Sequence, residues 1–267
     1  MTSRRTERTT MTSPQESPDA LRDKVAVVTG AAGGLGRAIS RRLHAAGARL
    51  ALVDRDEAGL ADAAAEFGDD AATFAVDLTD DARTEALPGE VRDRLGTLDI
   101  LVNNAGVRQI ASILDLTPDE WRHTLDVDLT APFVLSRAAI PGMIEQGRGK
   151  IVNIASITGE LAFADRSAYC VAKAGIIMLT KTITLEFAAR GIWCNAIGPG
   201  VVETPMTSEY FRSGPMRESI ERNAPMKRWA QPEEIAGPVA FLCGPESDYV
   251  NGTTLFVDGG WNSAKTY

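Results

Sequence analysis

Short apolar runs rich in β-branched residues recur along the chain, and segments with helical periodicity separate them. The apolar runs predict seven buried strands, at 24–30, 48–54, 72–77, 98–106, 149–156, 191–200 and 253–260. The periodic segments predict helices at 35–46, at 57–67, from 117 onward, at 169–189 and at 232–243. Because parallel strands need crossover connections, which cover both sheet faces, this alternation predicts an α/β fold with one doubly wound, seven-stranded parallel sheet.

The composition indicates one globular domain preceded by an N-terminal tail. Hydrophobic residues make up 44% of the 267 residues and charged residues 24%, which supplies enough apolar material for a buried core. Residues 1–20 are rich in Thr, Ser, Arg and Pro, so we predict a disordered tail there and a single domain over 21–267. A partner-binding or targeting arm and a simple extension before Met11 both fit the tail.

Charge and cysteine usage exclude several classes of function. The net charge of −8 argues against nucleic-acid binding and favours a small-molecule substrate. Cys170, Cys194 and Cys243 are odd in number and far apart, which favours a reducing cytoplasm. His44 and His123 show no metal-ligand spacing, so we expect no metal. The sequence lacks a secretory signal and an uncharged apolar run of about eighteen residues, so we expect no membrane partner.

A glycine-rich turn connects the first strand to the first helix. Gly30, Gly34 and Gly36 stand in this turn, where the absence of a Cβ lets the backbone approach a pyrophosphate. The helix N-terminus behind the turn adds N–H donors. The spacing G-x-x-x-G-x-G differs from the G-x-G-x-x-G fingerprint, and tight turns also need Gly for structural reasons. The turn alone is therefore weak support for a dinucleotide site.

An acidic residue after the second strand strengthens the dinucleotide interpretation. Asp54 follows Gly36 by eighteen positions, where an acid that binds the adenosine ribose is expected. Its charge would repel a 2′-phosphate, which favours NAD over NADP. Arg55 is able to neutralise Asp54 or bind a phosphate, and a second alternative is that Asp54 caps the next helix. Asp77 and Leu78, after the third strand, are predicted to meet the adenine, with a plain loop role as the alternative for Asp77.

Candidate catalytic groups lie in the second half of the chain. Tyr169 and Lys173 are four positions apart at the start of a predicted helix, so both side chains lie on one face. A nearby ammonium lowers the pKa of a phenol, as a general base for an alcohol requires. Ser156 ends a predicted strand thirteen residues earlier, and ligands bind beyond the carboxyl ends of such strands. Its hydroxyl is suited to hold a substrate oxygen.

Several motifs together resemble the short-chain dehydrogenase/reductase family over roughly residues 21–262. They are TGAAGGLG (29–36), NNAG (103–106), Ser156, YCVAK (169–173), NAIGPG (195–200) and YVNGTTLFVDGG (249–260). The resemblance implies a Rossmann fold and hydride transfer between a nicotinamide and an alcohol or carbonyl. It implies that Tyr169 is the acid/base, that Lys173 binds the nicotinamide ribose and that Ser156 positions the substrate oxygen. It further implies cofactor contacts by Leu35, Asn104, Ala105, Gly106, Pro199, Gly200, Val202 and Thr204, with Asn103 and Gly106 supporting the sheet.

Asp128 departs from the family pattern. The family usually has Asn here in a V-N-L-type motif, where it acts through a bound water in proton relay, but this chain reads VDL. An ionised Asp donates no hydrogen bond, yet it is able to pair with Lys173. Pro132 has no N–H to meet the Asp128 carbonyl, which is left to accept from water. We therefore expect Asp128 to keep the water site as a catalytic residue, with an ordinary solvated residue as the alternative.

The segments that follow the site motifs are expected to form the substrate pocket. The residues predicted to line it are Arg108, Thr158, Glu160, Phe163, Arg166, Met206, Tyr210 and Phe211. Two arginines near one pocket suit a carboxylate, phosphate or sulfonate, although arginines in loops are often simply solvated. NAIGPG and AKAGIIMLTK are also similar to sugar-acid and polyol dehydrogenases within the family.

We therefore predict an NAD-dependent oxidoreductase that acts on a secondary hydroxyl of a polar sugar, sugar acid or polyol. One alternative is an NADPH-dependent 3-oxoacyl-[carrier protein] reductase, which Asp54 opposes. A second alternative is a non-catalytic NAD-binding sensor, which the complete Ser156, Tyr169 and Lys173 set opposes. The resemblance also implies a homotetramer built on the two long helices, and Trp261 is predicted either to approach a neighbouring subunit or to pack in the core.

Overall fold

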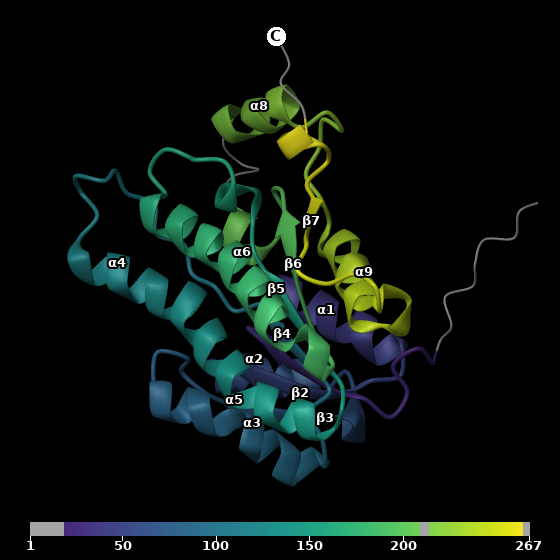
Figure 1. Ribbon diagram of the computed structural model, residues 1–267. Coiled ribbons are helices and arrows are strands. Elements are labelled where there is room, and N and C mark those ends of the chain that lie inside the picture. Colours follow the sequence, from purple (N-terminus) through teal and green to yellow (C-terminus); the bar gives the residue numbers. More distant parts are fainter. Residues whose placement is uncertain (1–18, 209–213, 264–267) are drawn as a thin grey trace, which may run out of the picture.

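The computed structural model describes residues 19–208 and 214–263. Their seven strands form one parallel sheet in the order β3-β2-β1-β4-β5-β6-β7 (Figure 1). The strands are β1 Val25–Thr29, β2 Arg49–Asp54, β3 Ala71–Ala75, β4 Ile100–Asn103, β5 Gly149–Ile154, β6 Ile192–Pro199 and β7 Thr254–Val257. This confirms the predicted fold. The strand order reverses between β1 and β4, which is where sheets of this kind bind their ligands. Residues 1–18 of the predicted tail lie outside the described residues.

Helices cover both faces of the sheet, as the apolar runs of the strands require. Strands β1, β4 and β5 are buried along their whole length. Successive residues of one strand serve opposite cores: Val27 packs with Leu101 on one face, while Val28 packs with Leu50 on the other. Helices α1 (Gly34–Ala45), α2 (Glu57–Ala64) and α9 (Pro232–Cys243) cover one face, and α3 (Asp81–Leu95), α5 (Ala131–Glu145) and α6 (Ser167–Phe187) cover the other (Figure 1).

Two helices among the described residues have no counterpart in the sequence prediction. Helix α3 is largely polar and shows no clear apolar stripe, but its ends carry signals that would have revealed it. The Asp80 side chain accepts from the Arg83 N–H at its start, and Gly96 ends it in the left-handed conformation with φ of 87°. Helix α8 (Gly214–Asn223) is also polar. The helix predicted at 57–67 is shorter in the structure, where it ends at Ala64.

A single long helical segment carries the residue that departs from the family pattern. Helix α4 (Pro118–Leu125) begins at a capping box, in which Thr117 and Glu120 hydrogen-bond reciprocally. It continues through a π-helical turn over Asp126–Thr130 into α5. Such turns arise where the regular hydrogen-bond ladder is interrupted, and Pro132 cannot donate to the Asp128 carbonyl. The π-helical turn thus lies where Pro132 removes the usual partner of the Asp128 carbonyl.

Two helical segments, 118–145 and 167–190, are long and apolar enough to cross a membrane by length and composition alone. In this fold they cover the sheet, and 61% and 39% of their most apolar windows are buried inside the protein. Core helices of globular proteins pass the same test. On α6, Ile176 and Ile177 are buried and Leu179 packs against the same apolar cluster, so these three residues belong to the core of the subunit.

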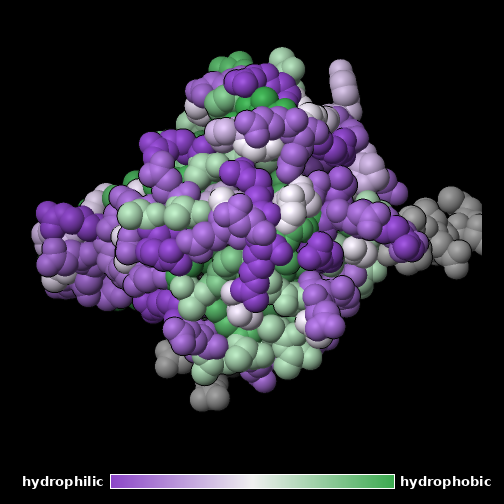
Figure 2. Space-filling view, turned by 90° about the horizontal axis from the view of Figure 1, so that it is seen from below, coloured by the Kyte–Doolittle hydropathy of each residue, from purple (hydrophilic) through white to green (hydrophobic). Residues whose placement is uncertain are grey.

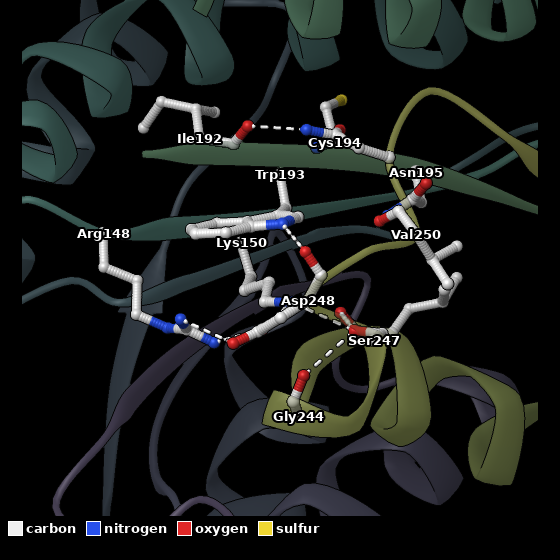
Figure 3. A network of polar contacts seen from close by, with 12 residues as sticks. Arg148, Lys150, Ile192, Trp193, Cys194, Asn195, Gly244, Ser247, Asp248 and Val250 are labelled. Atoms are coloured by element: carbon white, nitrogen blue, oxygen red, sulfur yellow. Dashed lines mark hydrogen bonds and ion pairs between the residues drawn. The ribbon is translucent and has the colours of Figure 1, made fainter. Parts of the chain in front are cut away.

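A buried lysine closes the end of the sheet opposite the carboxyl ends of the strands. Lys150, on β5, is 2% exposed and donates to Ser247 Oγ at 3.0 Å, with Asp248 2.9 Å away (Figure 3). Arg148 binds the same carboxylate, and both cations lie over the Trp193 ring. Burial lowers the pKa of Lys150, whereas Arg148 holds the pKa of Asp248 at about 2.

Viewed from below in Figure 2, the surface of the protein is mainly hydrophilic, with hydrophobic residues confined to patches.

Candidate active site

The glycine turn between β1 and α1 packs backbone against backbone. Gly30 has φ of +66°, and a Cβ on it would lie 2.9 Å from Ala105 Cα. A Cβ on Gly36 would overlap the Gly30 carbonyl oxygen. On the other side, a Cβ on Gly34 would lie 2.9 Å from Pro205 Cδ. Each glycine therefore permits a close approach of neighbouring protein atoms that a Cβ would prevent.

The loop after β4 is fastened to this turn. The Thr29 hydroxyl accepts from the backbone N–H groups of Asn104 and Ala105, at 2.9 and 3.0 Å. The Asn104 amide donates to the Thr29 carbonyl oxygen at 2.8 Å. Asn103 is buried and donates to Asn153 Oδ1, so it joins β4 to β5, in line with its predicted support of the sheet. Thr29 was not predicted as a site residue, although a hydroxyl residue directly before the glycine turn was the available signal.

Asp54 stabilises the glycine turn from the end of β2. One carboxylate oxygen accepts from the Ala32 N–H at 3.1 Å, and the other accepts from the Asp56 N–H at 3.2 Å. The alternative that Asp54 caps the next helix is wrong, because Asp56 is the N-cap of α2 and accepts from the Gly59 N–H. Asp54 and Arg55 both line the central cavity.

The central cavity, of about 520 Å³, runs along the carboxyl ends of the strands. At its far end Asp77 accepts from the Thr79 N–H and hydroxyl, which hold its pKa below the ordinary value. All the residues predicted to bind the cofactor line this one cavity: Gly30, Gly34, Leu35, Gly36, Asp54, Arg55, Asp77, Leu78, Asn104, Ala105, Gly106, Tyr169, Lys173, Pro199, Gly200, Val202 and Thr204. A cavity of this volume, lined by the glycine turn at the start of α1 and by this set of residues, fits an extended nicotinamide dinucleotide.

Ser156, Tyr169 and Lys173 meet at the middle of the cavity. Helix α6 begins at Ser167, so its first turns carry Tyr169 and Lys173 on one face. The Lys173 ammonium lies 5.4 Å from the centre of the Tyr169 ring and donates to the Ile154 carbonyl oxygen at 3.0 Å. The Ser156 hydroxyl accepts from the Thr158 N–H at 3.2 Å, and Ser156 and Tyr169 line the same cavity. The fold thus brings together three groups that are up to 17 positions apart in sequence.

Asp128 is completely buried beside this group and is not the solvated residue that one interpretation of the sequence allowed. Its Oδ2 lies 3.1 Å from the Lys173 ammonium, and its Oδ1 accepts from the Val107 N–H at 2.7 Å. Gly106 makes room for it, since a Cβ there would lie 3.1 Å from Oδ2. The predicted pairing of Asp128 with Lys173 is therefore present.

The ionisable groups of this cluster shift one another. Burial raises the pKa of Tyr169, and Asp128 adds to the rise, while Lys173, Ser156 and Arg108 oppose it. Burial opposes the charged form of Lys173, but Asp128 and Tyr169 outweigh that effect and raise the pKa of the ammonium. Burial also raises the pKa of Asp128, against the opposing effect of Lys173. The two charges of the ion pair stabilise each other in a site without bulk water.

The part of the cavity beyond this cluster mixes cations with apolar walls. Arg108 donates to the Met206 carbonyl oxygen and Arg166 to that of Ala164. Phe163 and Trp261 form an apolar wall, with ring centroids 5.9 Å apart. Of the predicted substrate residues, Arg108, Thr158, Phe163, Arg166 and Met206 line the cavity.

Other predictions for this pocket fare differently. The prediction that Glu160 lines the substrate pocket is wrong. Its side chain is exposed, accepts a hydrogen bond from Asn262 Nδ2 at 2.6 Å and does not line the cavity. Tyr210 and Phe211 lie outside the described residues. Trp261, 8% exposed, packs within its own subunit and was not predicted to line the cavity. Its position near the C-terminus gave no sequence signal of proximity to the site.

Comparison with known proteins defines the class of this site. A family model described as enoyl-(acyl carrier protein) reductase matches residues 30–262. The 3-oxoacyl-[acyl-carrier-protein] reductase of Vibrio harveyi is 37% identical, over 90% of this chain and 98% of its own. The trans-4-hydroxycyclohexanecarboxylate dehydrogenase of Sinomonas cyclohexanicum is 39% identical, over 91% of this chain and 94% of its own.

A solved structure agrees. The gluconate 5-dehydrogenase of Burkholderia cenocepacia J2315, in complex with NADP and tartrate, superposes with a TM-score of 0.88 at 35% identity, covering 94% of this chain and 99% of its own. The site is that of a nicotinamide-dependent oxidoreductase of secondary alcohols and ketones. The chain belongs to the short-chain dehydrogenase/reductase family.

Proposed function

We propose that the protein transfers a hydride between NAD and a secondary alcohol or ketone on a small polar substrate. The observation that carries this proposal is the convergence of Ser156, Tyr169 and Lys173 on the dinucleotide-sized cavity. The nicotinamide, when bound, exchanges the hydride. Tyr169 exchanges the proton at the substrate oxygen, and the Ser156 hydroxyl holds that oxygen. Lys173 binds the nicotinamide ribose, and the carbonyl of residue 128 keeps a water for proton relay.

The first test is to follow NADH formation by absorbance with NAD and then with NADP. The panel comprises sugars, sugar acids, polyols and simple secondary alcohols, and ketones are offered with the reduced cofactors. Turnover of a polar alcohol with NAD would support the proposal. Absence of turnover with any panel member, despite measurable NAD binding, would favour the non-catalytic sensor.

Asp54 supports NAD as the cofactor, since its carboxylate would lie against a 2′-phosphate. One solved relative of this fold holds NADP, so the choice between the two cofactors needs a direct test. We expect Asp54→Ser to raise the NADP-to-NAD ratio of kcat/KM by about tenfold or more, because about 1.4 kcal/mol of repulsion is removed. Ser keeps an acceptor for the Ala32 N–H. The control is Asp69→Ser, which removes an exposed carboxylate and should leave the NADP-to-NAD ratio of kcat/KM unchanged. A wild-type preference for NADP would refute this assignment.

Arg108 and Arg166 support an anionic substrate such as a sugar acid, because both line the substrate end of the cavity. A gluconate dehydrogenase and a hydroxycyclohexanecarboxylate dehydrogenase among the relatives support the same substrate class. The proposed function also covers a polyol or a neutral sugar as the substrate.

We expect Arg108→Gln to lower kcat/KM for a hydroxy acid by about tenfold, mainly through KM, because one charge-assisted contact is lost. The corresponding neutral alcohol should be affected much less. Steady-state kinetics on both substrates check this. The control is Arg122→Gln, which alters an arginine whose side chain is 67% exposed on α4. An equal loss on both substrates would contradict recognition of the anion.

The second candidate is an NADPH-dependent 3-oxoacyl-[carrier protein] reductase, which the 37% identical relative favours. Asp54 opposes it through its charge. Offering a 3-oxoacyl thioester on carrier protein with NADPH, beside the small-molecule panel, separates the two candidates.

We also propose a cytoplasmic homotetramer assembled through α5 and α6. Support comes from exposed apolar side chains on their outer surfaces, Phe133, Val171, Met178 and Leu185. Sedimentation equilibrium of the full chain measures the assembly.

A further inference from the structure

We propose that Asp128 is a positioning residue whose carboxylate neutralises Lys173 and thereby keeps Tyr169 in its phenol form near neutral pH. The phenol form is the proton donor for a ketone, so the site favours reduction until the pH becomes alkaline. This inference rests on the proposed acid/base role of Tyr169. It assigns a role to the carboxylate charge itself, which the Asn usual in this family lacks.

The arrangement of the ion pair makes the neutralisation effective. Asp128 is fully buried and its carboxylate lies 3.1 Å from the Lys173 ammonium, which is closer than the 5.4 Å from that ammonium to the Tyr169 ring centre. The Val107 N–H fixes the other carboxylate oxygen at 2.7 Å. The Ile154 carbonyl fixes the ammonium at 3.0 Å. Both charges are therefore held in place, and neither is screened by bulk water.

An uncompensated ammonium within about 4–6 Å would lower a neighbouring acid's pKa by roughly 1–3 units. Here the carboxylate opposes that field at Tyr169. The other charged side chains whose fields reach this cluster are Arg108, from the loop after β4, and His123, from α4. Burial raises the pKa of Tyr169, and Asp128 raises it further. The phenol is therefore the prevailing form at neutral pH.

The charge state of Tyr169 selects the direction that the site serves best. In reduction, a hydride from the reduced nicotinamide adds to the carbonyl carbon, and the Tyr169 proton moves to the carbonyl oxygen. The products are the alcohol, the oxidised nicotinamide and a tyrosinate, which regains its proton from solvent. Oxidation needs the tyrosinate first, because it removes the alcohol proton as the hydride leaves. Oxidation therefore requires a higher pH in this protein than it would require in the Asp128→Asn variant.

The test is an ultraviolet titration of tyrosinate in the full-length protein, without substrate. The chain has four tyrosines, so the difference between each protein and its Tyr169→Phe counterpart isolates Tyr169. We expect Asp128→Asn to lower the Tyr169 midpoint by about one pH unit or more. Asn keeps the side-chain shape and an acceptor for the Val107 N–H. The control Asp126→Asn removes an exposed carboxylate two positions away and should leave the midpoint unchanged. Asp128→Ser is a second neutral variant should the Asn protein fold poorly.

The pH profile of kcat gives the second measurement. The rising, low-pH limb of the kcat profile for alcohol oxidation should move to lower pH by the same amount in Asp128→Asn, so oxidation on that limb becomes about tenfold faster. An unchanged or raised midpoint in both neutral variants would overturn the inference, since it would mean that the carboxyl is neutral or without effect. The titration needs no turnover. A shifted midpoint without activity on any substrate would therefore count against the proposed function alone, whereas activity without a shift would count against the role of Asp128 alone.

Discussion

Tyr169→Phe is expected to lower kcat by about three orders of magnitude and to leave dinucleotide binding intact. General acid–base catalysis contributes 10²–10⁴-fold, and Phe removes the only proton that Tyr169 exchanges. The ring itself remains, so the packing at the start of α6 should survive. Steady-state kinetics, together with quenching of protein fluorescence by NADH, measure the two effects separately.

Tyr249→Phe is the matched control, because Tyr249 is fully exposed and distant in sequence from the catalytic motif. It should retain wild-type kcat and Tm. A Tyr169→Phe protein with more than one tenth of wild-type kcat would contradict the acid/base role. Loss of NADH binding in the same protein would instead indicate that Tyr169 mainly orders the cofactor site.

Gly36→Ala is expected to destabilise the protein by about 3 kcal/mol and to abolish dinucleotide binding. The new Cβ would overlap the Gly30 carbonyl oxygen and come within 2.9 Å of Ala31 Cα. Both obstacles are backbone atoms, so neither can move aside by changing a rotamer. The glycine turn must open instead, which displaces the N–H groups aimed at the pyrophosphate. Thermal unfolding and NADH titration report the two losses.

Gly89→Ala offers a control with the same chemical change. Gly89 lies inside α3, and a Cβ there would meet no atom within 4 Å. Ala is the better helix former by about 1 kcal/mol, so this variant should be unchanged or slightly more stable. Similar Tm losses in both variants would show that the glycine turn is not a special constraint.

The strands were predictable because each is a short apolar run buried on both faces, a pattern that depends only on local sequence. Helix α3 was missed for the opposite reason. It contributes few buried residues, among them Leu87 and Val91, and its stripe is too narrow to detect. Its caps at Asp80 and Gly96 were local signals that periodicity alone does not use.

The residues predicted for the site line one cavity where each belongs to a motif with fixed local geometry. The glycine turn and the Tyr169–Lys173 pair are of this kind. The substrate residues were less predictable, since a loop side chain is free to point either way. Arg108 lines the cavity, whereas Glu160 turns away to Asn262. Trp261 lies more than 90 residues from Tyr169 in sequence and reaches the same cavity only through the fold.

The sequence by itself determined the parallel α/β sheet, the glycine turn and the placing of Tyr169 and Lys173 on one helix face, because apolar periodicity, glycine placement and helical spacing are local properties. Only the tertiary structure decided the environment of Asp128. Burial and the 3.1 Å approach of Lys173 arise where α4–α5, α6 and the loop after β4 pack together. Electrostatic interactions depend on distance and on exclusion of water, and segments remote in sequence set both.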